Sequence, residues 1–260
     1  MTSARVLAVT NQKGGVGKTT TSINLAASLV TTGRRVLLVD LDPQGNATMG
    51  SGVDKRTIAA SVYQVLLGSM PISEVRVKTS AHYDLTPANR ELAGAEIELV
   101  DLSSRESRLK DALDEVRDEY DFILIDCPPA LNLLTVNGLC AAHAVMIPMQ
   151  CEYYALEGLS DLVQTIKKVR SHLNPALEIE GLLRTMYDPR NMLAQQVSEQ
   201  LQQHFGDKVY RTVIPRNIRL AEAPSHGMPV LALDRQSKGA LAYLALAGEM
   251  LSRPGREIHG

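Results

Sequence analysis

Short runs of apolar, mostly β-branched residues alternate along the chain with longer stretches in which apolar residues recur every three or four positions. The first pattern predicts buried strands and the second predicts amphipathic helices. Strands that alternate with helices are typical of βαβ units and parallel sheets. We therefore expect an α/β fold with a mostly parallel, twisted sheet of about six to eight strands and helices on both faces. The predicted strands cover residues 5–10, 35–40, 121–126, 144–149, 179–187 and 209–215.

Helical spacing is clearest in residues 104–120 and 156–173, where Leu and Val return on one face. The first helix is expected to begin near Lys18 and to end before Gly33, because glycine commonly follows the last helical turn. No repeat or long linker divides the chain. We therefore expect a single domain over residues 1–260, with a short flexible tail from about residue 253.

The composition is that of an ordinary globular protein, with 45% hydrophobic and 22% charged residues, no Trp and two Phe. Because Trp is absent and Phe is scarce, the core is expected to be mainly aliphatic, which suits a parallel sheet covered on both faces. The N-terminal residues contain no apolar run long enough for a signal peptide. The most apolar later stretch, residues 130–149, contains two Asn and one His, which argues against a membrane-spanning helix. The sequence predicts a cytoplasmic protein that does not bind membranes.

The three cysteines, Cys127, Cys140 and Cys151, are too few and too scattered for a disulfide framework or a zinc site. They are expected to pack as small apolar side chains. His143 lies between a helical stretch and a predicted strand and is expected to pack there as well. His226 receives no chemical role.

The net charge of −2 is unevenly distributed along the chain. Residues 164–238 contain 11 Lys and Arg against 7 Asp and Glu, whereas residues 1–163 contain 14 against 20. The basic excess fits either an ordinary solvated surface or a site for a polyanion, and composition alone does not separate the two.

The residues between the first strand and the first helix, NQKGGVGKTT at positions 11–20, resemble a phosphate-binding loop. Gly17, Lys18 and Thr19 complete the pattern G-x-x-x-x-G-K-[ST], with the required strand before it and helix after it. The glycines let backbone N–H groups point at phosphate oxygens, and the helix N-terminus adds positive potential. Lys18 is expected to bridge the β- and γ-phosphates, and the Thr19 hydroxyl is expected to bind Mg²⁺.

This loop departs from the pattern at two neighbouring positions. Gln12 stands where the first glycine is expected, and Lys13 adds a charge that the pattern does not require. Taken alone, such a lysine is an ordinary solvated side chain.

Acidic residues follow two other predicted strands. Asp40 and Asp42 come at the end of strand 35–40, and they would lie on one side if the strand continued through both. Asp126 ends the run FILID, a Walker B pattern in which the acid holds the water shell of the metal. Ligands of open α/β sheets bind at this carboxyl edge. The sequence contains no N-K-x-D motif for a guanine base, so ATP is the expected nucleotide.

Five segments together closely resemble the ParA/Soj chromosome-partition ATPases, members of the MinD-like group of P-loop proteins with a deviant Walker A loop. The segments are KGGVGKTT, VLLVDLDPQGNAT, FILIDCPP, QCEYYALEGLSDL and VIPRNIRLAEAPSHG, and the resemblance extends over residues 6–251. It implies a slow ATPase that forms a homodimer in the ATP state. It also implies that Lys13 reaches across a two-fold interface to the partner's phosphates, with Gly14 at that interface.

The resemblance implies roles for individual residues as well. Asp42 would orient the attacking water, Thr19 would bind Mg²⁺ directly, and Asp40 and Asp126 would support the ion through water. Lys13, Lys18 and Asp42 would be the catalytic set. The implied nucleotide contacts are Lys13, Gly14, Gly15, Val16, Gly17, Lys18, Thr19, Thr20, Pro215 and Asn217, of which the last two would lie beside the adenine.

Members of the ParA/Soj family bind double-stranded DNA without sequence preference. The matching positions here are Arg190 and Arg219, with Arg216, Lys208 and Arg211 as helpers. Arginine contacts with phosphates need no base reading, and a dimer presents two such patches. The expected activator of hydrolysis is a ParB/Spo0J-type centromere-binding protein. These properties imply a cytoplasmic, nucleoid-associated protein that serves either a chromosome or a plasmid.

Three other functions on this scaffold have weaker support. A MinD-type membrane regulator needs a basic amphipathic C-terminal helix, but Pro254 and Gly255 interrupt the tail ALAYLALAGEMLSRPGREIHG at residues 240–260. An iron–sulfur carrier needs converging thiolates, which the spacing of the cysteines does not indicate. A metabolic ligase needs a pocket for a small substrate, for which the sequence has no signal.

Overall fold

The computed structural model describes residues 3–253 and contains one eight-stranded sheet in this range. The site is expected at the edge of this sheet where the carboxyl ends of the strands lie. The strand order is β3-β4-β2-β5-β1-β6-β7-β8. Every neighbouring pair is parallel except β3 and β4, which are antiparallel at one edge. The strands are β1 (Arg5–Val9), β2 (Val36–Asp40), β3 (Val77–Lys78), β4 (Asp84–Thr86), β5 (Phe122–Asp126), β6 (Ala144–Met149), β7 (Glu178–Tyr187) and β8 (Val209–Pro215).

This architecture confirms the predicted α/β fold class. Each of the six predicted strands is present, with bounds within one residue of those expected. The sequence did not indicate β3 and β4, because runs of two and three residues are too short to show an alternating pattern.

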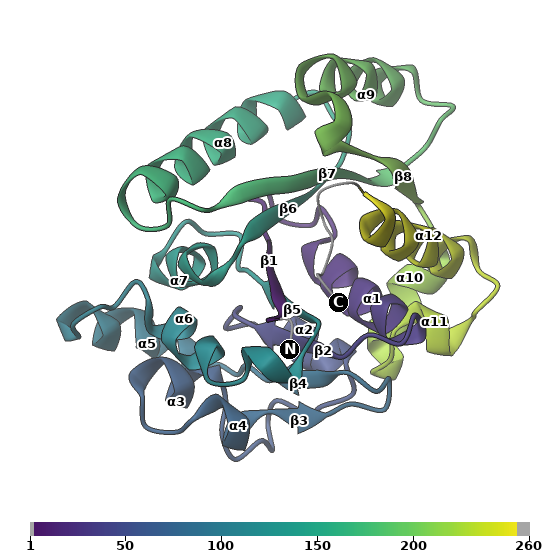
Figure 1. Cartoon of the computed structure of the whole chain (residues 1–260). Coiled ribbons are helices and arrows are strands. Elements are labelled where there is room, and N and C mark those ends of the chain that lie inside the picture. The colour runs from purple at the N-terminus through teal and green to yellow at the C-terminus, as the bar shows by residue number, and fades with distance from the viewer. Residues whose placement is uncertain (1–2, 254–260) are drawn as a thin grey trace.

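Helices cover both faces of the sheet (Figure 1). Figure 1 places α1, α10, α11 and α12 on one side and α3, α5, α6, α7 and α8 on the other. The helices are α1 (Lys18–Thr31), α2 (Asn46–Gly50), α3 (Val62–Leu67), α4 (Ile72–Val75), α5 (Leu92–Glu98), α6 (Arg108–Asp114), α7 (Leu133–Ala141), α8 (Ala155–His172), α9 (Met192–Phe205), α10 (Ile218–Glu222), α11 (Val230–Leu233) and α12 (Lys238–Ser252).

Alternate residues of the central strand β1 enter two separate cores. Val6 and Ala8 pack with helices α3 to α9, whereas Leu7 and Val9 pack with α1, α2 and α10 to α12. This alternation follows from the period of two in a strand that is buried on both faces. The layers fix the sheet rigidly, so the loops at its carboxyl edge start from defined positions.

One helix ends where the sequence predicts, and another ends earlier than predicted. Gly33 follows α1 with a φ of +82°, as predicted for the residue after a helix. The helix predicted within 104–120 is shorter than expected: α6 ends at Asp114, and a 3₁₀ turn at Arg117–Glu119 follows. This turn leads the chain directly into β5, while Val116 still reaches the core.

Two expectations concern the membrane and the C-terminus. Among the helices within residues 3–253, none combines the length and the apolar character that crossing a bilayer requires. The tail expected from about residue 253, with Pro254 and Gly255, lies outside the described residues except for Arg253 itself.

Candidate active site

A cleft of about 730 Å³ opens at the carboxyl ends of β1, β2, β5, β7 and β8, where α/β folds bind ligands. It brings together the phosphate-loop residues, Asp42, and the predicted adenine contacts Pro215 and Asn217, which are far apart in the sequence. Lys13 and Val16 are the predicted nucleotide residues outside its lining. The lining from these segments is Gly14, Gly15, Gly17, Lys18, Thr19, Thr20, Asp42, Pro43, Gln44, Ile214, Pro215, Arg216 and Asn217.

The phosphate end of the cleft is shaped by two glycines. Gly15 and Gly17 have φ values of +73° and +88°, which side-chain-bearing residues rarely adopt. Gly17 is also the N-cap of α1, and no side chain of the described residues caps this helix. The first N–H groups of α1 therefore point toward the cleft without a side-chain acceptor, an arrangement that suits a phosphate.

Lys18 supplies the positive charge inside the cleft. Its side chain is buried, and Nζ donates a hydrogen bond to the carbonyl oxygen of Lys13 at 3.1 Å. Burial lowers the pKa of Lys18, and the neighbouring carboxylates of Asp126 and Asp42 act in the opposite direction. At this position the Lys18 ammonium group can contact the phosphates of a bound nucleotide directly, without water between them.

Thr19 and Asp126 form the part of the site that fits a magnesium ion. The Thr19 hydroxyl donates to Asp126 Oδ2 at 2.7 Å, and the Ser22 hydroxyl donates to Oδ1 at 2.8 Å. Burial, together with repulsion from Asp40, raises the pKa of Asp126 to about 7. Because Thr19 gives its proton to Asp126, its oxygen lone pairs remain available to a metal.

The donor set agrees with a metal held together with a substrate. Within residues 3–253, no group of three or more His, Cys, Asp or Glu side chains is arranged to hold a metal. Mg²⁺ commonly keeps several waters and is shared between one or two protein groups and the substrate phosphates. Thr19, with Asp126 behind it, is such a minimal protein contribution.

Asp40 and Asp42 do not point the same way, because β2 ends at Asp40. Asp40 is fully buried and accepts hydrogen bonds from the Thr48 N–H at 2.8 Å and the Thr48 hydroxyl at 2.7 Å. Burial raises its pKa to about 6. Asp42 lines the cleft, and its Oδ1 accepts the Gln44 N–H at 2.9 Å. Asp42 is thus the carboxylate placed to meet a water in the cleft, while Asp40 anchors α2.

The opposite end of the cleft is built by the segment that follows β8. Pro215 is the last residue of β8, and Asn217 is the N-cap of α10, with its Oδ1 accepting the Leu220 N–H at 3.3 Å. Pro215 and Asn217 both line the cleft, as the adenine assignment requires.

Sequence reasoning missed one residue that holds the phosphate loop in place. Thr185, near the end of β7, donates from Oγ1 to the carbonyl oxygen of Val16 at 2.7 Å and lines the cleft. Its neighbour Met186 also lines the cleft and has a φ of +48°. The available signal was their position at the end of a predicted strand, where the carboxyl edge of a parallel sheet places polar residues of a site.

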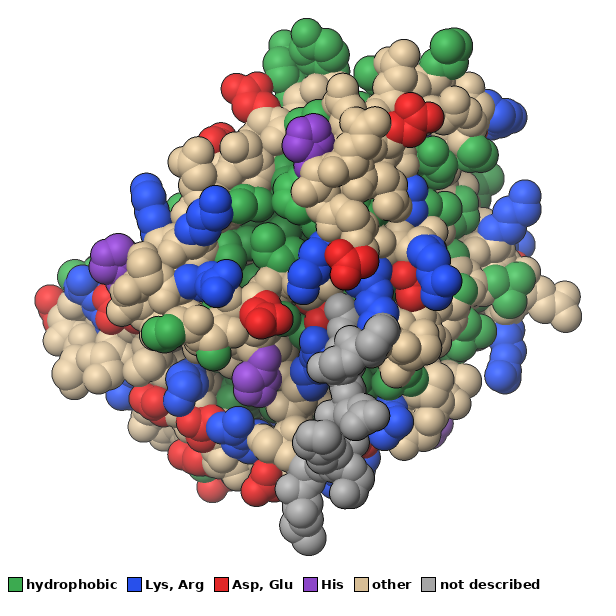
Figure 2. Space-filling view, turned by 45° about the horizontal axis from the view of Figure 1, so that its top comes forward, with side chains coloured by type: hydrophobic (Ala, Val, Ile, Leu, Met, Phe, Trp, Pro, Cys, Tyr) green, Lys and Arg blue, Asp and Glu red, His purple; other side chains and the backbone are tan. Residues whose placement is uncertain are grey.

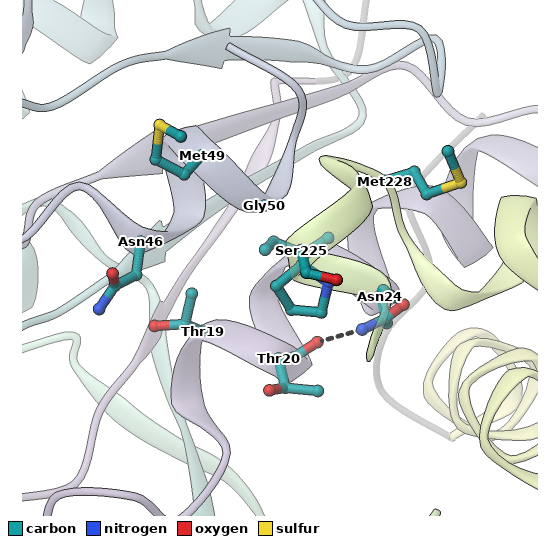
Figure 3. Close-up of a pocket in the computed structure, with 11 residues that line it drawn as sticks. Thr19, Thr20, Asn24, Asn46, Met49, Gly50, Ser225 and Met228 are labelled. Atoms are coloured by element: carbon teal, nitrogen blue, oxygen red, sulfur yellow. Dashed lines mark hydrogen bonds between the residues drawn. The ribbon is translucent and has the colours of Figure 1, made fainter. Parts of the chain in front are cut away.

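A smaller cavity of about 430 Å³ adjoins the cleft and shares Thr19, Thr20 and Asn46 with it. Figure 3 shows Thr20 and Asn24 of α1 side by side, with the Asn24 side chain donating to the Thr20 carbonyl oxygen at 2.7 Å. Asn24 also accepts the Val230 N–H at 2.7 Å. Its side chain therefore ties the first turns of α1 to α11.

The predicted DNA-binding arginines divide into two places. Arg190 and Arg216 line one groove of about 620 Å³ together with Lys238, and we call this the arginine groove. Arg219 lies nearby on α10, two residues after the groove residue Asn217. Lys208 and Arg211 line a different cavity at the start of β8. The structure thus brings the helper Arg216 together with Arg190, near Arg219, and does not bring the helpers Lys208 and Arg211 to this place.

Two of these arginines, Arg190 and Arg219, are already paired with carboxylates. Arg190 Nη2 lies 2.9 Å from Asp188 Oδ2, and Arg219 Nη1 lies 2.8 Å from Glu222 Oε2. Figure 2 shows a comparable mixture, with acidic and basic side chains interspersed over one face of the molecule. Ion pairs between exposed groups are weak and can exchange partners.

The cysteines and His143 take structural positions. All three cysteines are buried, and burial raises the pKa of Cys140 and of Cys151 to about 11. His143 Nδ1 accepts the Val6 N–H at 2.9 Å, which links the start of β6 to β1. Neither feature provides a nucleophile or a general base at the cleft.

Comparison with known proteins gives relatives over the whole chain. The sequence pattern of the AAA domain matches residues 4–179. The chain is 56% identical over 247 residues to the sporulation initiation inhibitor protein Soj of Bacillus subtilis, covering 95% of this chain and 98% of Soj. It is 53% identical over 252 residues to the chromosome partitioning protein ParA of Caulobacter vibrioides, covering 96% and 94%.

A solved structure matches the fold and contains nucleotide. It is described as cobyrinic acid a,c-diamide synthase from Mycobacterium smegmatis with bound ADP and magnesium. The TM-score is 0.84 at 42% identity, over 94% of this chain and 93% of that one.

Proposed function

We infer the function of this chain from the fact that it belongs to the Soj/ParA family of chromosome-partitioning ATPases. It is an ATPase that uses ATP and Mg²⁺. We propose that ATP joins two copies into a dimer, that the dimer binds double-stranded DNA without sequence preference, and that hydrolysis releases it. The observation that carries this proposal is the cleft that joins the phosphate loop, Asp42 and Asn217 while leaving Lys13 outside.

The residues of the cleft divide the chemistry among them. The N–H groups of the loop and the Lys18 ammonium hold the phosphates, while Pro215 and Asn217 hold the adenine end. Thr19 and Asp126 would hold Mg²⁺, which when bound offsets phosphate charge. Asp42 would accept a hydrogen bond from the attacking water and align it with the γ-phosphate. Asp40 contributes by fixing α2 through its hydrogen bonds with Thr48.

Two features support a dimer held by nucleotide. Lys13 is exposed beside the cleft and is not part of its lining, so its side chain does not contact the phosphate site of its own chain. A Cβ added at Gly14 would have no neighbour within 4 Å among the described residues, so packing within the chain does not require glycine there. A glycine that its own chain does not need fits a surface against which a second copy closes.

The arginine groove supports the DNA contact. Arg190, Arg216 and Lys238 converge there, and Arg219 is on the adjoining helix. Each is exposed and can reach a DNA phosphate, and for Arg190 and Arg219 the phosphate would replace a carboxylate partner. One groove binds weakly, and two on a dimer bind together, so ATP would control DNA affinity through pairing.

The proposal includes a partner and a place in the cell. A ParB/Spo0J-type centromere-binding protein would stimulate hydrolysis, as a supplied positive charge does in other P-loop enzymes. The protein would act in the cytoplasm on the nucleoid.

Retention of random-sequence duplex DNA with ATP, ADP or no nucleotide, over a salt series, tests the proposal. We expect DNA to be retained with ATP but not with ADP or without nucleotide. The logarithm of the binding constant should fall linearly with the logarithm of the salt concentration. Asp42→Ala should retain DNA with ATP while hydrolysis falls by about 100-fold or more. Arg219→Glu should lose retention but still bind ATP. Equal retention with ATP and ADP contradicts the proposal, and rapid turnover by Asp42→Ala removes that residue from its role.

A small-molecule ligase is the second candidate, because the 42% identical structure is named as a diamide synthase. The two functions differ in what stimulates ATP turnover. Stimulation by DNA together with a centromere-binding protein supports partition. Turnover that depends on a carboxylic acid substrate and an amine donor supports a ligase. Pelleting with liposomes in the same assay tests the membrane-regulator alternative.

A further inference from the structure

Lys13 has a partner within its own chain. Its Nζ lies 2.5 Å from Oε2 of Glu152, in the short segment between β6 and α8. The two side chains are 46% and 50% exposed, and neither residue lines the nucleotide cleft. Within one chain, the charge of Lys13 is therefore balanced by a carboxylate on the surface beside the cleft.

The backbone holds these two side chains close together. β1 and β6 are neighbours, so the loops that follow them meet at one edge of the sheet. Asn11 donates from Nδ2 to the Pro148 carbonyl oxygen at 2.9 Å, and its Oδ1 accepts the Lys13 N–H at 2.9 Å. A turn closed by the Glu152 N–H and the Gln150 carbonyl oxygen, 3.0 Å apart, then presents Glu152. The ion pair thus joins two anchored loops.

The residues beside Glu152 have the character of an interaction surface. Tyr153 and Tyr154 are 74% and 69% exposed, and their rings meet edge to face with centroids 4.9 Å apart. Tyrosine is enriched at protein interfaces. Since the pair adjoins the side chain that would enter a second copy, residues 152–154 are placed to contact that copy.

We propose that Glu152 is a positioning residue for Lys13. It holds the ammonium group on its own chain, and the triphosphate of a second copy must outcompete it before ATP can join the two chains. Glu152 thereby sets the protein concentration at which pairing occurs. This inference rests on the proposed ATP-dependent dimer.

Charge decides the direction of the effect. A single exposed carboxylate is a weak partner for lysine, whereas a triphosphate concentrates several negative charges. Each pairing event breaks two Lys13–Glu152 contacts, one per chain. It also leaves two carboxylates near an interface that already gathers two triphosphates. Removing the charge of Glu152 should therefore favour the dimer.

Glu152→Gln tests this inference, with Glu157→Gln as the matched control. Glu157 is exposed on the first turn of α8, so the control makes the same change nearby without touching Lys13. In sedimentation velocity over a concentration series with ATP, in the Asp42→Ala background, Glu152→Gln should pair at an about two- to thirtyfold lower concentration. Glu157→Gln should match its parent, and Lys13→Ala should abolish any difference that Glu152→Gln makes.

A second measurement does not depend on pairing. In the nucleotide-free protein, acylation of Lys13 followed by peptide mass spectrometry should be faster in Glu152→Gln than in the parent or in Glu157→Gln. Unchanged acylation overturns the ion pair. A parent that pairs with ATP while Glu152→Gln pairs equally or less readily overturns the positioning role. A parent that stays single in ATP, with faster acylation in Glu152→Gln, instead overturns the proposed dimer.

Discussion

The nucleotide cleft and the arginine groove are both built from charged and polar residues, but they are held in opposite ways. Lys18 in the cleft lining, and Asp40 and Asp126 behind it, are buried and hydrogen-bonded, and the partners of the two carboxylates come from other segments of the fold. At the groove, Arg190 is 89% exposed, and its partner Asp188 lies two residues away in the same turn. The side chains of the cleft are held in place by the fold, whereas the ion pairs at the groove can rearrange at little cost in free energy.

This difference in burial and pairing indicates which kind of interaction each site is suited to. Buried polar groups are costly to leave unpaired, so the geometry of the cleft is held within narrow limits and suits the alignment of a reaction. Exposed ion pairs contribute little and exchange readily, which suits the proposed DNA contacts, because these would have to form and break along any sequence. Changes in the cleft should accordingly have large effects, and changes to the carboxylates that pair with arginines at the groove should have small ones.

Lys18→Ala should have the largest effect. Without the buried ammonium, the phosphates meet Asp42 and Asp126 with no compensating charge, and nucleotide affinity should fall by about 100-fold or more. Calorimetric titration with ATP and Mg²⁺ measures this. Lys13→Ala is the matched control: it should keep the nucleotide affinity of the single chain and lose pairing. Equal losses of affinity in both variants would show that Lys13 serves its own nucleotide.

Asp126→Asn tests how strongly burial acts in the cleft. Burial raises the pKa of Asp126, so the folded protein binds a proton there between about pH 4 and pH 7 that the unfolded chain releases. The free energy of unfolding should therefore decrease as pH rises through this range, by roughly 2–3 kcal/mol between pH 5 and pH 8 from this group.

In Asp126→Asn that loss should be absent, so the variant should be more stable than the parent at pH 8. Urea unfolding in EDTA at the two pH values measures the difference. Asp118→Asn, at an exposed position, is the control. An unchanged pH dependence in Asp126→Asn would assign the effect to another buried carboxyl group, and Asp40 would be the first to examine.

Thr185→Val should have a moderate effect. The substitution keeps the shape of the side chain but leaves the buried Val16 carbonyl oxygen without its donor, at a cost of about 1–3 kcal/mol in the free energy of unfolding. Thr185→Ser keeps the hydroxyl and should keep most of the stability. Denaturant unfolding of the two variants makes the comparison, and equal losses would show that the methyl group matters more than the hydrogen bond.

Asp188→Asn should have the smallest effect. Releasing Arg190 from its carboxylate should tighten DNA binding by about two- to fivefold at low salt, and less as salt screens the contact. Asp54→Asn is a close control, because Arg56 pairs with Asp54 in the same arrangement, with Nη2 and Oδ2 also 2.9 Å apart, outside the groove. Equal gains in both variants would indicate a general charge effect rather than a contact of Arg190.

The sequence predicted the parts of the site that depend on local pattern. β1, the loop and α1 follow one another along the chain, so strand period, glycine spacing and helix start could all be read there. Asp40 and Asp42 would share a side only if the strand continued through both, and β2 ends at Asp40; where a strand ends depends on its neighbours, which the local pattern does not show. The contacts of Asp40 with Thr48, of Thr185 with Val16 and of Lys13 with Glu152 join distant segments, which no local pattern indicates.

The division of the basic residues shows the same limit. Arg190, Arg216 and Lys238 come from three segments and meet only because β7, β8 and α12 are neighbours in space. Lys208 and Arg211 are closer to Arg216 in the sequence. They lie at and near the start of β8, however, whereas Arg216 follows its end, so the length of the strand separates them from the groove.

The five residues of α10 connect the two regions mechanically. Its N-cap, Asn217, is part of the wall against which the base would rest, and Arg219 is its second residue. A single-turn helix moves as one rigid body, so a displacement of Asn217 also re-aims the guanidinium of Arg219. Under the proposed function, the direction in which Arg219 faces DNA would therefore depend on which nucleotide occupies the cleft, even before a second copy binds.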